Sequence, residues 1–209
     1  MLPGRPLPSN VRARSALTAL VLSAACAALA PWPAAQAADD YAPIAQMLRS
    51  GRTTEALARA DQLLATRPRD PQLQFLRAQA LASGGRTADA LAAYLQLTRE
   101  YPELSEPHNN LAVLYASQNE LEAAQAALQA ALRANPTYAT AHENLGDIQL
   151  RLAVQSWSRA RQLEPGLVSV VPKLAAARSL IDATTPATRV RGAASAAASA
   201  PMRTASAPR

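Results

Sequence analysis

The sequence has little of the chemistry on which enzymes, metal sites and disulfide-linked proteins depend. Its 209 residues include one cysteine, Cys26, so a disulfide within the chain is excluded. The two histidines, His108 and His142, are too few for a zinc site, which needs three or four donors. Three common catalytic motifs are missing as well: Gly-x-Ser-x-Gly, Gly-x-x-x-x-Gly-Lys and His-Glu-x-x-His. We therefore expect a protein that is not an enzyme and that uses no metal and no cofactor.

The middle of the chain also has nearly equal numbers of basic and acidic residues, although the whole sequence carries a net charge of +6. The first 37 residues hold three of the 21 basic side chains, and the segment after Asp182 holds four more. The body between them has 14 basic and 15 acidic residues, a net charge of −1. A nearly neutral body gives no support to nucleic-acid binding. We expect neither a nucleic acid nor a small-molecule substrate.

No apolar run is long enough to cross a bilayer comfortably, and the longest one, residues 16–30, lies near the start of the chain. Three arginines precede it, prolines 31 and 33 end it, and the small residues Ala35-Gln36-Ala37 follow. This order is typical of a secretory signal. We predict a signal peptide over residues 1–37, a mature chain that begins near Ala38, and export to a bacterial periplasm.

The segment Ser23-Ala24-Ala25-Cys26 offers an alternative, because it resembles the lipobox of bacterial lipoproteins. In that motif the cysteine becomes a lipidated N-terminus. Serine stands here where the motif prefers leucine, and a full cleavage signal follows downstream. The alternative is therefore a lipid-anchored outer-membrane adaptor with Cys26 as its anchor.

What the chain does have is a period of 34 residues. Three prolines, Pro68, Pro102 and Pro136, are spaced by this interval. Other positions repeat in step, among them Gly51, Gly85 and Asn119, and also Ala56, Ala90 and Ala124. A fixed period of this length indicates a solenoid of stacked units. Function in such a protein depends on which face of the stack binds a partner.

Each unit has the pattern of two amphipathic helices joined by a tight turn. In residues 71–104, Ser83-Gly84-Gly85-Arg86 interrupts the helical spacing, and Pro102 ends the second helix. The second helix carries its apolar residues at helical spacing: Ala90, Leu91, Tyr94, Leu95 and Leu97.

These features resemble the tetratricopeptide repeat. The match rests on the small residues Ala78, Ala112 and Gly146, the aromatic Tyr115, the turn glycine, the mid-helix alanine and the terminal proline. The resemblance implies an all-α, right-handed solenoid of about 3.5–4 helix-pair repeats over residues 38–166. We place the repeats at 37–70, 71–104 and 105–138, with a shortened fourth at 139–165.

The fourth repeat lacks the residues of its inter-helix turn, since Pro165 comes five residues early and no glycine or proline lies between Gly146 and Pro165. We expect either one long helix, with or without a kink, or a very abrupt turn. Trp157 should fill the core beneath this repeat, and residues 167–183 should form a capping helix.

Residues 184–209 are rich in alanine, serine and proline, with Val190 and Met202 as their large apolar side chains. Such a composition predicts a disordered basic tail. The tail is either a weak tether to anionic lipid or envelope polymer, or a solvated extension.

In tetratricopeptide repeat proteins the first helices of successive repeats line a concave groove, which usually binds an extended peptide or a helix of a partner protein. The resemblance implies the same for this chain, as a non-catalytic scaffold or adaptor. The groove residues that it implies are Phe75, Gln79, Asn109, Asn110, Val113, Ser117, Glu143, Asn144, Asp147 and Arg151.

Two of these residues, Asn110 and Asn144, are 34 residues apart and resemble the asparagine ladder of repeat proteins that hold peptides through their main chain. An amide side chain can pair with a peptide backbone through both its donor and its acceptor. Alternatively, each asparagine satisfies a helix-end or inter-repeat carbonyl. On the first interpretation, replacing both with alanine weakens binding and hardly changes thermal stability.

Lysine is nearly absent, and Lys173 lies outside the repeats. The lysine-rich clamp that some members of the family use for a carboxylate terminus is therefore not expected. His108 and His142 are one repeat apart, so they are either a pair of metal ligands or helix-start residues duplicated with the repeat.

Overall fold

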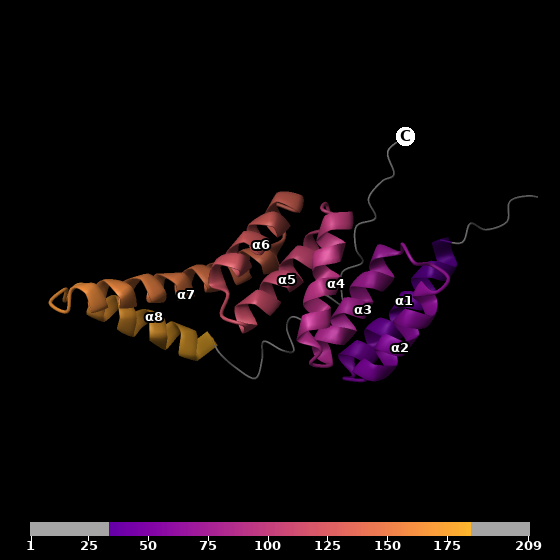
Figure 1. The fold of residues 1–209 in the computed structure, drawn as a ribbon, viewed down its shortest axis with the longest axis horizontal. Helices are drawn as coiled ribbons and strands as arrows, with labels where there is room; N and C mark the ends of the chain where they lie inside the picture. Colours follow the sequence, from indigo (N-terminus) through magenta and orange to yellow (C-terminus); the bar gives the residue numbers. More distant parts are fainter. Residues whose placement is uncertain (1–33, 185–209) are drawn as a thin grey trace, which may run out of the picture. The chain divides into compact units, whose positions relative to one another are not determined.

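The computed structural model describes residues 34–184 as eight α-helices (Figure 1). These are α1 (Ala34–Arg49), α2 (Thr53–Leu64), α3 (Pro71–Ser83), α4 (Thr87–Glu100), α5 (Ser105–Ser117), α6 (Leu121–Ala134), α7 (Ala139–Leu163) and α8 (Val170–Thr184). The predictions for the start of the signal peptide, for Cys26 and for the tail beyond residue 184 lie outside the described residues.

The chain divides into two units at Asp39. The described part of the first unit is the beginning of α1, residues 34–39. The second unit begins at Asp40 and contains the rest of α1 and all the other helices. None of the helices between residues 34 and 184 combines the length and the apolar character needed to cross a membrane.

The 34-residue period appears directly in the helix starts, because α3, α5 and α7 begin at Pro71, Ser105 and Ala139. The turn between the two helices of a unit needs one residue with left-handed backbone geometry. Gly51 and Gly85 supply it at φ of 74° and 77°, and Asn119 supplies it in the third unit at φ of 62°. Asparagine is among the few residues with a side chain that tolerate this conformation.

Small side chains allow the paired helices to pack closely. Ala56, Ala90 and Ala124, which are in step along the sequence, are all fully buried. The main core lies over α3–α7 and is built largely from the buried apolar side chains of these helices. Within it the rings of Phe75 and Tyr94 meet edge to face, with centroids 5.9 Å apart.

The fourth unit is one continuous helix of 25 residues, α7. Of the two expected outcomes, the long helix is therefore the one observed, since nothing between Gly146 and Pro165 breaks it. α8 runs back beside α7 and packs on it through Val170, Leu174 and Ala177 (Figure 1). Trp157 is only partly buried, with the Lys173 ammonium 5.9 Å from its ring centroid, so it does not fill a core there as expected.

Candidate functional site

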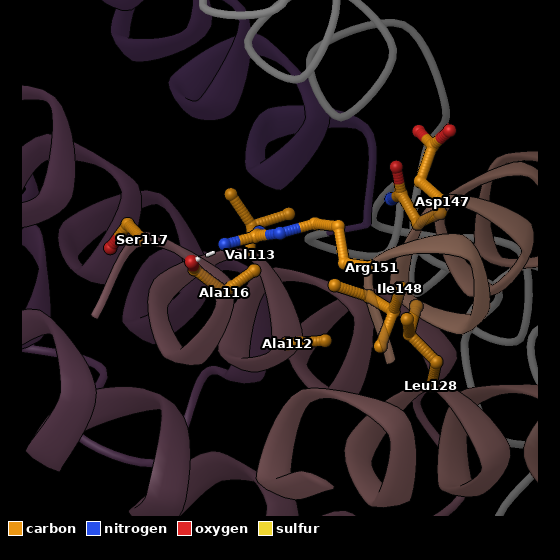
Figure 2. Close-up of a pocket in the computed structure, with 9 residues that line it drawn as sticks. Ala112, Val113, Ala116, Ser117, Leu128, Asp147, Ile148 and Arg151 are labelled. Atoms are coloured by element: carbon orange, nitrogen blue, oxygen red, sulfur yellow. Dashed lines mark hydrogen bonds between the residues drawn. The ribbon is translucent and has the colours of Figure 1, made fainter. Parts of the chain in front are cut away.

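A pocket of about 220 Å³ opens between α5 and α7 (Figure 2). We call this surface the groove. Its apolar floor comes from Ala112 and Ala116 of α5, Leu128 of α6 and Ile148 of α7. The other lining residues are Val113, Ser117, Asn144, Asp147 and Arg151. The Val113 side chain is 37% exposed there and adds apolar surface to the groove.

Arg151 closes one end of the groove. Its guanidinium donates to the carbonyl of Ala116 at 3.3 Å and to Oδ1 of Asn119 at 3.2 Å. Both acceptors lie at the C-terminal end of α5, where the helix dipole favours a cation. Figure 2 shows the Arg151 side chain reaching across Val113 toward Ala116, while Asp147 points in a different direction. Arg151 thereby holds α7 to α5 across the groove.

A chain of amide side chains connects three helices beside the groove. Nδ2 of Asn144 donates to Oδ1 of Asn109 at 2.9 Å, and Nδ2 of Asn109 donates to Oδ1 of Asn110 at 3.4 Å. Nδ2 of Asn110 then donates to the Tyr94 hydroxyl at 3.0 Å. Burial raises the pKa of Tyr94, and the bond from Asn110 only partly opposes that shift, so the hydroxyl is neutral. The network therefore joins α7, α5 and α4.

This arrangement bears on the asparagine ladder. Asn110 and Asn144 are half-buried, and the amide nitrogen of each already donates to a neighbouring side chain. Asn144 lines the groove, whereas Asn110 does not. Backbone binding by this pair stays a prediction. Asn144 donates to a side-chain carbonyl of the preceding repeat, whereas the partner of Asn110 is the Tyr94 hydroxyl.

Two family profiles match the helical body, one described as tetratricopeptide repeat over residues 48–105 and one described as TPR repeat over residues 114–152. The chain is a tetratricopeptide repeat protein. A curated relative, the TPR repeat-containing thioredoxin TTL4 of Arabidopsis thaliana, is 37% identical over 79 residues. The matched stretch covers 38% of this chain and 12% of that protein.

Solved structures with a similar fold include the one titled Naa15/Naa10 bound to HypK-THB. It matches with a TM-score of 0.52 and 19% identity, over 70% of this chain and 23% of that chain. A thermophilic TPR protein of Thermus thermophilus matches with a TM-score of 0.49 and 21% identity, over 66% of this chain and 79% of that chain. The predicted all-α solenoid is confirmed. Tetratricopeptide repeats typically form non-catalytic scaffolds for protein–protein interaction.

Three of the expected groove residues are buried and cannot offer contact area. Phe75 is 1% exposed and packs on Tyr94 in the core of the tetratricopeptide repeats. Gln79 and Asn109 are 8% and 3% exposed. The expectation that Phe75 provides an apolar groove contact is therefore wrong, because its ring is used to hold α3 and α4 together.

The other expected residues separate into two groups. Val113, Ser117, Asn144, Asp147 and Arg151 come together around the pocket. Glu143 is exposed one turn before Asp147 on α7 and does not line the pocket. Sequence reasoning missed the floor residues Ala112, Ala116, Leu128 and Ile148. Ala116, three residues after Val113 on the same helix, is the one that this spacing could have indicated.

The two histidines occupy the start of their helices. The Nε2–H of His108 donates to the Pro102 carbonyl at 3.2 Å, and that of His142 donates to the Pro136 carbonyl at 3.0 Å. Gln74 makes the same bond to Pro68 at 2.8 Å, one repeat earlier. Burial lowers the pKa of His108, and the Pro102 carbonyl partly opposes this. Both histidines lie in the first turn or so of their helices, as the second interpretation expects, and within residues 34–184 no group of three potential metal ligands is found.

Proposed function

We propose that this tetratricopeptide repeat protein is a non-catalytic adaptor that holds a segment of a partner protein in the groove between α5 and α7. The observation that supports this most is the hollow with an apolar floor beside the partly exposed Val113, because an aliphatic side chain of a partner would bury apolar area there.

The lining of the groove limits what can bind there. The floor formed by Ala112, Leu128 and Ile148 suits one aliphatic side chain of the partner, since it offers no polar group to a buried polar atom. The rim carries an amide at Asn144 and a hydroxyl at Ser117, either of which can pair with a peptide backbone. An extended segment with an aliphatic residue is the ligand that fits.

The location of the protein belongs to the same proposal. The signal-like pattern of residues 1–37 supports export to the periplasm. The alternative is a lipid anchor at Cys26, which would place the adaptor at the outer membrane. Metabolic labelling with a fatty acid separates the two: label that disappears in Cys26→Ala supports the anchor, and an unlabelled chain supports a free periplasmic protein.

Crosslinking in the cell tests the groove. A photoreactive amino acid at position 113 should capture one dominant protein, while the same amino acid at Gln129, which is exposed on α6, should not. Mass spectrometry would identify the captured protein. Equal capture at both positions, or none at either, would remove the groove from the proposal.

A further inference from the structure

After α8 the chain has come back along α7 to the level of the groove. At 1.5 Å per residue, α7 is about 37 Å long and α8 about 22 Å. Since α8 runs back beside α7, Thr184 comes level with the middle of α7, about 15 Å from its start. This is the level of Asp147 and Arg151, which line the groove. Val190 is six residues further on, and at up to about 3.3 Å per residue it can lie as far as about 20 Å from Thr184.

The chemistry of that segment complements the groove. Arg189-Val190-Arg191 follows five residues after Thr184 and places one aliphatic side chain between two cations. In an extended backbone successive side chains alternate, so Val190 can enter the apolar floor while both arginines stay at the rim. On α7 the groove is lined by one acidic and one basic side chain, Asp147 and Arg151, and Glu143 is exposed one turn before Asp147.

We propose that residues 185–209 bind the groove of their own chain, with Val190 in the pocket beneath Val113. The inference rests on the proposed function, and it adds how the groove is regulated: an external segment must displace the internal one. A tethered segment has an effective concentration in the millimolar range, so a weak internal contact is enough to compete with a partner.

Crosslinking of the purified full chain tests the internal contact. A photoreactive amino acid at position 113 should give a product of monomer mass in which residues 185–191 are joined to α5, read by mass spectrometry after digestion. The same amino acid at position 129 serves as the control and should give none. A product of dimer mass would mean that a second copy fills the groove, and it would overturn the proposal, as would the absence of any product.

A matched pair of variants adds a quantitative arm. Val190→Asp should lower the internal crosslink at least ten-fold, whereas Met202→Asp, the same kind of change elsewhere in the segment, should leave it nearly unchanged. A labelled peptide of residues 185–209 should bind the full-length Val190→Asp chain at least ten-fold more tightly than the wild type, because the internal competitor is weakened. Equal binding to both chains would refute internal occupancy.

The two proposals fail separately. If position 113 captures a partner in the cell but yields no internal product in the pure chain, adaptor function stands and self-occupancy is wrong. If an internal product forms but no partner is ever captured, the groove serves the chain itself and the adaptor function is wrong.

Discussion

The hydrogen bond between Asn144 and Asn109 should contribute measurably to the stability of the stack, because it joins α7 to α5 across a repeat boundary. Asn109 is 3% exposed, and its Oδ1 accepts from Nδ2 of Asn144 at 2.9 Å. Replacing Asn109 with alanine leaves that half-buried donor unpaired. The loss of such a partner costs about 1–3 kcal/mol. For a folded body of this size that corresponds to a decrease in Tm of roughly 2–12 °C.

A double-mutant cycle isolates the bond itself. Asn109→Ala, Asn144→Ala and the double variant are unfolded in urea and followed by circular dichroism, with Gln129→Ala as a surface control that should change the free energy of unfolding by less than about 0.5 kcal/mol. The coupling between the two asparagines should be about 1 kcal/mol. Hydrogen exchange should rise in α7 before it rises in α3, since the variants loosen the last repeat first.

Strict additivity would refute this reasoning. If the double variant loses the sum of the two single losses within about 0.3 kcal/mol, the two amides do not stabilise each other. The network also changes an expectation drawn from the sequence, that alanine at Asn110 and Asn144 would hardly affect thermal stability. Both amides donate within the chain, so this double variant should melt earlier as well as bind more weakly.

Three further predictions concern the repeat positions. Burial lowers the pKa of His108, so the unfolded chain takes up its proton first and stability falls as pH drops below about 6.5. His108→Gln, which copies Gln74, should keep the loop bond and reduce that fall, and an unchanged Tm profile from pH 7 to 5 would contradict it. Gly85→Ala should lower the free energy of unfolding by about 1–2 kcal/mol, because Gly85 has a φ of 77°. Gly85→Asn should lower it clearly less, since Asn119 adopts the same conformation in the next turn. Equal losses for the two variants in urea unfolding would argue against backbone strain. Ala124→Leu should cost about 1–3 kcal/mol by overpacking a fully buried site, and a neutral effect on Tm would show that α5 and α6 can separate without loss.

The repeat architecture was predictable because the residues that end helices and form turns recur at a fixed spacing. Pro68, Pro102 and Pro136 stop helices, and the turn positions at Gly51, Gly85 and Asn119 require left-handed geometry that few residues adopt. Both constraints are local, so they can be recognised in the sequence without knowledge of the packing. The shortened fourth repeat left two outcomes open, and one long helix is observed because no residue in it favours a turn.

The groove was less predictable, because a position within the repeat does not specify how deeply its side chain is buried. Val113 and Gln79 are equivalent along the sequence, yet one is 37% exposed and the other 8%. Neighbouring residues differ as much: Asn109 and Asn110 point about 100° apart on one helix, and only the first meets Asn144. Which amide is buried depends on how α7 crosses α5, and that crossing is a tertiary property that spacing does not encode.

The missing turn in the fourth repeat links these features. A complete repeat would have placed a second helix against α7 and ended the stack with an ordinary pair. As one uninterrupted helix, α7 instead carries Asn144 and Arg151 on α5 with its first half and supports α8 with its second half. The same continuity brings Thr184 back to the level of the groove. We infer that the shortened repeat is what would allow the segment after α8 to reach the groove of its own chain.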